Sequence, residues 1–123
     1  VPGSSAWFVG GVVAYANSVK QGLLGVPANE LEAHGAVSEP VVLAMAAQAA
    51  TRLGADCALS VSGVAGPTGG TPGKPVGTVW IGWCVNGKAD AERFLFPGDR
   101  REVRRASALA ALRGLAERLG RLR

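Results

Sequence analysis

A tyrosine and a lysine lie five residues apart in the segment GGVVAYANSVK, residues 10–20. A lysine whose pKa is lowered by burial can act as a general base, and a phenol can orient that lysine or a nucleophile. Tyr15 and Lys20 do not have the i, i+4 spacing that places two side chains on one helix face, so they converge only if the chain bends between them. Chemistry alone favours the alternative, an aromatic residue and a solvated charge at the end of a strand.

The glycine-rich segment GVAGPTGGTPGKPVG, residues 63–77, invites comparison with a phosphate-binding loop. The P-loop pattern fails, because Gly73 and Lys74 are followed by Pro75 where a hydroxyl is needed to bind magnesium. The dinucleotide fingerprint fails as well, since no helix is predicted directly after the glycines. Two interpretations of this segment are therefore equally supported: a loop that faces the substrate, and a plain connector between two strands.

Arginines are concentrated at the end of the chain, where residues 99–123 hold eight of them. They scatter around the predicted helix without interleaved aromatic residues, which favours a solvated face over nucleic-acid binding. Arg100 differs from the others because it lies at the helix N-terminus, where main-chain amides and the helix dipole favour an anion. A guanidinium in that position can hold a phosphate through two hydrogen bonds.

The composition indicates one soluble globular domain that spans residues 1–123. Hydrophobic residues make up 48% of the chain and charged residues 18%, which excludes a disordered tail. No apolar run is long enough for a membrane span, and no signal peptide is recognised, so we expect a cytoplasmic protein. Cys57 and Cys84 lack the spacing and histidine neighbours of a zinc site, so we expect free thiols and no metal.

These candidate residues must be positioned by strands and helices. The apolar run FVGGVVAYA predicts a buried strand over Phe8–Ala16. Ser38, with Glu39 and Pro40 after it, predicts the start of a helix that ends at Gly54. Apolar residues repeat on one face of that helix at three-to-four spacing, at Val42, Met45, Ala46, Ala49 and Leu53.

Three further strands and a last helix follow. CALSVSGVAG, residues 57–66, alternates between two faces, and VGTVWIGWCV, residues 76–85, is apolar on both faces as in a central strand. Asn86-Gly87 predicts a type I′ hairpin that returns the chain as an antiparallel strand in AERFLFPG, residues 91–98. Asp99 and Glu102 have capping-box spacing, so a helix begins there. Its leucines form an apolar stripe of at least three turns: Leu109, Leu112, Leu115, Leu119 and Leu122.

The predicted fold class is therefore α/β, a mixed β-sheet covered by helices, because some strands are linked by a hairpin and others by helices. Seven blocks carry a family resemblance in the same order along nearly the whole chain: VPGSSAWF, GGVVAYANSVK, LLGV, HGAVSEPVV, SVSGVAGPTGG, KPVGTVW and FPGDRREVRR. They resemble the C-terminal domain of the CinA family, the competence-damage proteins that include the nicotinamide-nucleotide amidases, or PncC. The resemblance implies hydrolysis of the carboxamide of nicotinamide mononucleotide to nicotinic acid mononucleotide and ammonia, in pyridine-nucleotide recycling, without metal or cofactor.

The resemblance also implies roles for five residues. Lys20 matches the general-base lysine of these serine/lysine hydrolases, and Tyr15 matches the tyrosine that assists it. We expect the Lys20 amine to be uncharged and close to the Tyr15 phenol. Ser5 matches a polar active-site serine, and Ser62 stands where relatives often have threonine. Arg100 matches the arginine near the substrate phosphate.

One departure from the family pattern concerns the nucleophile. The family serine lies in a motif like AESCTGG, upstream of the stretch where this chain begins, and the sequence contains no such motif. We therefore expect an N-terminally truncated domain that is catalytically incomplete by itself. Ser4 or Ser5 is disfavoured as a replacement, because the resemblance sets the lysine geometry for a different serine. A missing first strand would leave a sheet edge uncovered, so we expect a homodimer or a missing segment.

Two other functions remain open. A non-catalytic member would bind a nucleotide or support a partner domain. A nucleic-acid-associated competence factor is a weaker alternative, which the arginine-rich helix barely supports.

Overall fold

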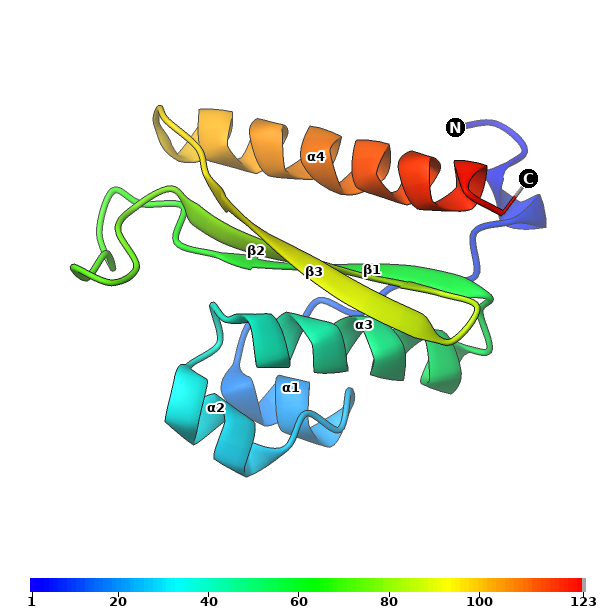
Figure 1. The fold of residues 1–123 in the computed structure, drawn as a ribbon, viewed down its shortest axis with the longest axis horizontal. Coiled ribbons are helices and arrows are strands. Elements are labelled where there is room, and N and C mark those ends of the chain that lie inside the picture. Colours follow the sequence, from blue (N-terminus) through cyan, green and yellow to red (C-terminus); the bar gives the residue numbers. More distant parts are fainter. Residues whose placement is uncertain (123) are drawn as a thin grey trace.

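A computed structural model describes residues 1–122 of the chain (Figure 1). The short 3-10 helix η1 spans Ser4–Ala6. In chain order the remaining elements are α1 (Asn17–Gly22), α2 (Ala28–His34), α3 (Glu39–Leu53), β1 (Cys57–Gly63), β2 (Thr78–Val85), β3 (Lys88–Leu95) and α4 (Arg100–Gly120). Within these residues no helix combines the length and the apolar character needed to cross a membrane.

The three strands form one antiparallel sheet in the order β1-β2-β3. Val85 pairs with Lys88 across the hairpin, and Asn86 and Gly87 both have positive φ, 50° and 83°, as the predicted type I′ turn requires. The α/β class with helices covering a sheet is confirmed, and β2 is the central strand. Both strand pairs are antiparallel, whereas the sequence predicted a mixed sheet.

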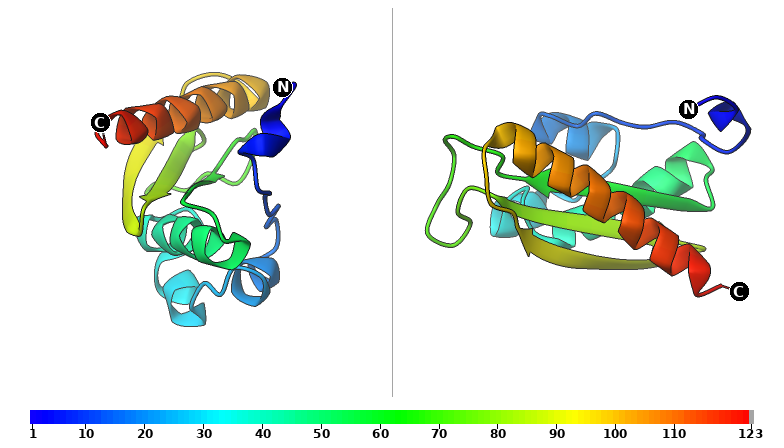
Figure 2. Two further views of the ribbon diagram at one scale, coloured as in Figure 1. Left: turned by 90° about the vertical axis from the view of Figure 1, so that its right-hand side faces the viewer. Right: turned by 90° about the horizontal axis from the view of Figure 1, so that it is seen from above.

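The sheet lies between two helical layers, with α3 on one face and α4 on the other (Figures 1 and 2). The two faces of β1 alternate as predicted. Leu59 packs in a cluster with Trp83 and Val103 on the α4 side, while Ala58 packs with α3 residues on the other. The small helices α1 and α2 lie beyond α3. A separate apolar cluster lies between them and α3, and its buried residues are Leu24, Val26, Leu31, Val41 and Met45.

Helix α3 has the predicted boundaries. Ser38 occupies the N-cap position in extended conformation, and Gly54 ends the helix with φ 65°. The Ser38 hydroxyl does not accept a hydrogen bond from the first turn; it donates to the Gly35 carbonyl at 2.7 Å. Ser38 therefore fixes the loop that leads into α3 rather than the helix amides.

Helix α4 begins with the predicted capping box, but it turns a different face to the sheet than the leucine stripe. Its buried residues are Val103, Ser107, Ala111 and Gly114. The leucines are largely exposed: Leu109, Leu112, Leu119 and Leu122 are 44%, 62%, 41% and 58% exposed. Leu115 is partly buried and packs against the cluster beneath α4, so most of the predicted leucine stripe lies beside the face that covers the sheet rather than on it.

Trp83 of β2 explains this orientation of α4. Its indole nitrogen donates to the Ala111 carbonyl at 2.9 Å, so the helix backbone lies close to the ring. A side chain at Gly114 would overlap the indole, and Arg118 lies over the ring at 3.7 Å from its centre. A leucine cannot occupy a helix face that approaches a tryptophan so closely, so small residues form it.

The predicted buried strand over Phe8–Ala16 is wrong. The segment is irregular, and Phe8, Val9 and Val13 are 60%, 60% and 89% exposed. A strand needs a hydrogen-bonded neighbour, and an apolar groove lies between this segment and β1. High valine content is therefore not sufficient to form a strand here.

Candidate active site

Lys20 is a buried lysine in the last turn of α1 and is only 6% exposed. The helix follows the irregular segment directly, so the side chain reaches back to that segment. Its Nζ donates to the Ala14 carbonyl at 2.8 Å and to the Tyr15 carbonyl at 3.4 Å. Burial lowers the pKa of Lys20 below its ordinary value. An amine with a lowered pKa is able to accept a proton at lower pH than an exposed lysine.

Tyr15 contacts Lys20 through its main chain. The phenol is 88% exposed, while the carbonyl of the same residue accepts the longer hydrogen bond from Nζ. The expected burial of the amine is present, but the expected contact with the phenol is replaced by carbonyl contacts. The five-residue spacing explains this, because α1 turns the lysine back toward the backbone of the preceding residues.

Ser62 lies near the end of β1, on the face that packs against α3. Two residues earlier on the same face, the Ser60 hydroxyl is buried and donates to the Val42 carbonyl at 2.7 Å. Because β1 runs antiparallel to α3 in this contact, Ser62 lies level with the beginning of α3. Ser60 is occupied in holding the helix, whereas Ser62 is half-buried at the strand end.

Ser5 and Arg100 lie at opposite ends of the molecule. Ser5 is exposed in η1, which lies at the end of the molecule away from the start of α4 (Figures 1 and 2). Arg100 is the first residue of that 21-residue helix, which is about 30 Å long. The structure does not bring these two predicted site residues together.

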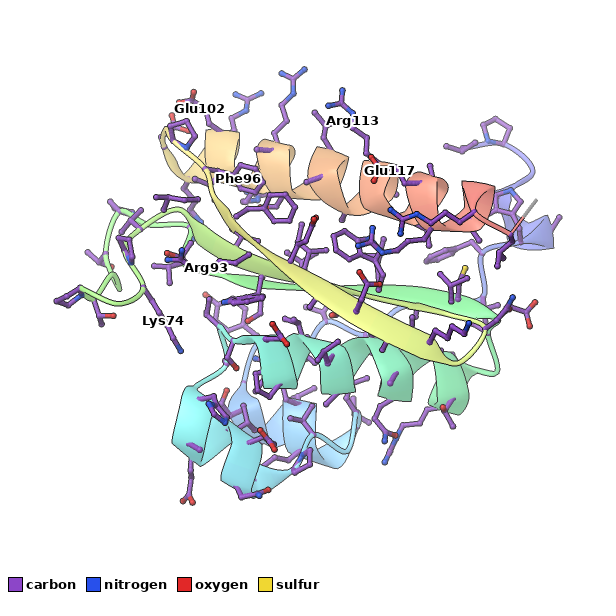
Figure 3. The ribbon with its side chains drawn as sticks, viewed as in Figure 1. Lys74, Arg93, Phe96, Glu102, Arg113 and Glu117 are labelled. Carbon is purple, nitrogen blue, oxygen red and sulfur yellow. The ribbon has the colours of Figure 1, made fainter. Side chains whose placement is uncertain are left out.

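Two cations hold the glycine-rich loop between β1 and β2. Arg100 donates to the Gly66 carbonyl at 3.2 Å, which ties the loop to the start of α4. Lys74 points toward the helices below the sheet in Figure 3, and its Nζ donates to the His34 carbonyl at the end of α2. Sequence reasoning treated Lys74 only as a failed P-loop lysine. An isolated cation among glycines was the signal that could have marked it as an anchor.

A groove of about 680 Å³ runs along the open edge of β1. One wall is the segment of residues 7–15. The opposite side is lined by β1, by residues of α3 and by the α4 leucines Leu112 and Leu115. Ala14 and Tyr15, the two hydrogen-bond acceptors of Lys20, belong to the first wall, and Ser60 belongs to the second. The buried amine is therefore directly behind the lining of this groove.

The fold and the site together define an α/β domain in which a buried lysine with lowered pKa adjoins a largely apolar groove. The model of the CinA C-terminal domain matches residues 1–119, and the chain belongs to this family. It is 54% identical over 112 residues to a CinA-like protein of Gemmatimonas aurantiaca, covering 91% of this chain. It is 52% identical over 117 residues to the nicotinamide-nucleotide amidohydrolase PncC of Pseudomonas putida, covering 95%.

Solved structures agree with this assignment. The competence damage-inducible protein A of Klebsiella pneumoniae superposes with a TM-score of 0.93 over 98% of this chain, at 38% identity, and is covered to 74% of its own length. The competence/damage inducible protein CihA of Agrobacterium tumefaciens superposes with a TM-score of 0.92 over 95% of this chain, also at 38% identity. The match covers 72% of the length of CihA. The chain spans 26% of the Gemmatimonas relative and 73% of the Pseudomonas one.

Proposed function

We propose that the chain belongs to an amidohydrolase that cleaves the carboxamide of nicotinamide mononucleotide to nicotinic acid mononucleotide and ammonia. The observation that carries this proposal is the burial of Lys20, which lowers the pKa of its amine beside a groove. The name of the Pseudomonas relative supplies the substrate. Ammonia release in pyridine-nucleotide recycling is the corresponding cellular role.

In the proposed reaction the neutral Lys20 amine takes the proton of a serine hydroxyl, and the serine oxygen attacks the amide carbon. The carbon–nitrogen bond then breaks, and the lysine returns the proton to the departing ammonia. Water hydrolyses the acyl-serine to the acid and regenerates the hydroxyl. By resemblance the nucleophile belongs to a motif like AESCTGG.

The other residues bind the substrate in this proposal. Arg100 stands at the junction of α4 and the glycine-rich loop, where a guanidinium can face a phosphate. Ser62 at the end of β1 supplies a hydroxyl to the nucleotide. Main-chain amides of the loop are donors for the oxyanion that forms on the amide carbonyl. Ser5 in η1 and Arg100 at the start of α4 lie toward opposite ends of the molecule, so Ser5 does not join Arg100 around one mononucleotide in this proposal.

A second candidate function is non-catalytic binding of a nucleotide by a CinA-family protein. The observation that favours it concerns Tyr15, which is 88% exposed and bonds through its carbonyl, not its phenol, to the buried lysine that it is expected to assist. Several relatives, such as those of Akkermansia muciniphila and Geotalea uraniireducens, carry only the name CinA-like protein.

The deciding experiment measures ammonia released from nicotinamide mononucleotide. It is run on these 123 residues and on the product of the whole reading frame that encodes them. We expect Lys20→Ala to lower turnover by about 100-fold or more, as loss of a general base does. The matched control is Lys88→Ala, because Lys88 is exposed at the hairpin on β3.

Each outcome separates the two candidates. Turnover that depends on Lys20 and not on Lys88 supports the amidohydrolase. Saturable binding of the mononucleotide without ammonia release, unchanged by Lys20→Ala, supports the binding protein instead. Circular dichroism of both variants checks that lost turnover does not reflect unfolding.

A further inference from the structure

A second groove, of about 700 Å³, lies between the first half of α4 and the end of β1. Its floor is apolar and includes Val61, Val79 and Val103. Three arginines of α4 line it as well, Arg101, Arg104 and Arg105. An apolar floor beside several guanidiniums is the combination found in pockets for small molecules with both an apolar body and an anionic end.

The three arginines have the spacing i, i+3 and i+4, which places them on one side of α4. The ion pairs found within residues 1–122 join Glu30 to His34 and Asp90 to Arg118, so none of the three is paired with a carboxylate there. Their guanidiniums therefore remain available to an external anion.

Their position in α4 is unfavourable for the helix itself. Arg101 lies in the first turn, at the positive end of the helix dipole, where a cation is destabilising. Arg101 and Arg105 also form a like-charged i, i+4 pair, which destabilises an isolated helix further. An arrangement that lowers helix stability without a compensating contact is typical of a functional site.

We propose that this arginine groove binds a soluble phosphate ester with at least two negative charges and an aromatic or apolar body, of the nucleoside diphosphate class. Guanidiniums bind phosphate oxygens through paired hydrogen bonds, and the valine floor takes the body of the ligand. The volume lies within the range of about 300–1,000 Å³ typical of small-molecule sites.

Nucleic acid fits the arrangement less well than a small ligand. The remaining arginines of α4 do not continue the same surface, since Arg118 is held by Asp90 and stacks on Trp83. Arg113 does not line the groove. A strand of nucleic acid needs a longer basic track and aromatic side chains for stacking.

The experiment is isothermal titration calorimetry of the protein with ADP as the probe. Pyrophosphate supplies the charge without the body, and adenosine supplies the body without the charge. The variants are Arg104→Gln and Arg105→Gln, with Arg113→Gln as the matched control on the same exposed helix. We expect saturable binding of ADP that either groove variant weakens by about tenfold or more. The control should remain within about twofold of the parent, because its charge lies outside the groove.

Several results would overturn the proposal. Absence of saturable ADP binding, or an equal loss in Arg113→Gln, removes the specific site and leaves general electrostatic attraction. If pyrophosphate binds with the same affinity as ADP, the valine floor contributes nothing to ligand binding. An oligonucleotide that binds more tightly than ADP, with a strong dependence on salt and on Arg113, would identify a nucleic-acid surface instead.

The site is independent of the proposed amidohydrolase activity. ADP binding should be unchanged in Lys20→Ala, since Lys20 bonds to residues of the other groove. Loss of ADP binding in that variant, with its fold intact, would place ADP at the Lys20 groove and overturn the assignment. Failure of the ammonia assay leaves this experiment unaffected.

Discussion

A charged amine would be poorly solvated at the place that Lys20 occupies. The side chain is 6% exposed, and two carbonyls are its hydrogen-bond acceptors. The carbonyl groups offset part of the lost hydration. Within residues 1–122, however, no carboxylate forms an ion pair with the amine. The neutral form is therefore favoured relative to an exposed lysine, which is the property that a general base needs.

This burial predicts a pH dependence of stability. Because the pKa of Lys20 is lower in the folded protein than its ordinary value of 10.5, the unfolded chain binds more protons between those two pKa values. The free energy of unfolding should therefore rise with pH across that window, and the penalty is fully present below it. Urea unfolding measures this at pH 7 and pH 10. The free energy of unfolding of the wild type, relative to that of Lys20→Met, should be higher at pH 10 than at pH 7.

The control for this prediction is Lys88→Met, because Lys88 is exposed. Its difference from the wild type should change little between the two pH values. A constant difference between the wild type and Lys20→Met would show that burial does not perturb the amine.

At the scale of elements, the packing of α4 is decided by one residue of β2. Trp83 is fully buried and donates to the Ala111 carbonyl. The helix must approach closely for that bond to form, and Gly114 provides the space. The leucines on the neighbouring side of α4 are consequently left exposed or directed toward the groove at β1.

Gly114→Ala should therefore destabilise the protein by about 1–3 kcal/mol, because the new methyl group overlaps the Trp83 indole. Gly120→Ala is the matched control in the last turn of α4, where no atom lies within 4 Å of the added carbon. It should be neutral or stabilising by up to about 1 kcal/mol through helix propensity. Thermal unfolding of both variants measures the difference, and equal effects would contradict the close approach.

At the scale of the whole molecule, the two edges of the sheet differ in protection. The β3 edge carries charged residues at Lys88, Asp90, Glu92 and Arg93, which discourage pairing with another strand. The β1 sequence, CALSVSG, has no charge, and its open side borders the apolar groove. Association through the β1 side is therefore favoured over association through β3.

The expected homodimer remains a prediction, and it can be tested on this difference. Sedimentation velocity of these 123 residues should show association that increases with concentration, because Leu112 and other apolar side chains are exposed beside the groove. Leu112→Gln should weaken it, and Leu95→Gln on β3 should not, although Leu95 is 60% exposed. A monomer at all concentrations would contradict the prediction.

The sequence by itself determined the elements whose signals are local. The Asn86-Gly87 turn and the Asp99 capping box depend on backbone conformations and hydrogen bonds within a few residues. The ends of α3 were likewise predictable from Ser38 and Gly54. For the site, the sequence singled out Lys20 by residue type and family pattern, and the lysine is indeed buried.

Only the tertiary structure decided the features that depend on distant partners. Residues 8–16 have the composition of a strand, but strand formation requires hydrogen bonds from a neighbouring strand, which the groove beside β1 prevents. The leucines of α4 have helical spacing, but the fit of Trp83 against Gly114 selects another face. Lys74 anchors its loop to His34, forty positions away in the chain, and no local pattern encodes a contact of that range.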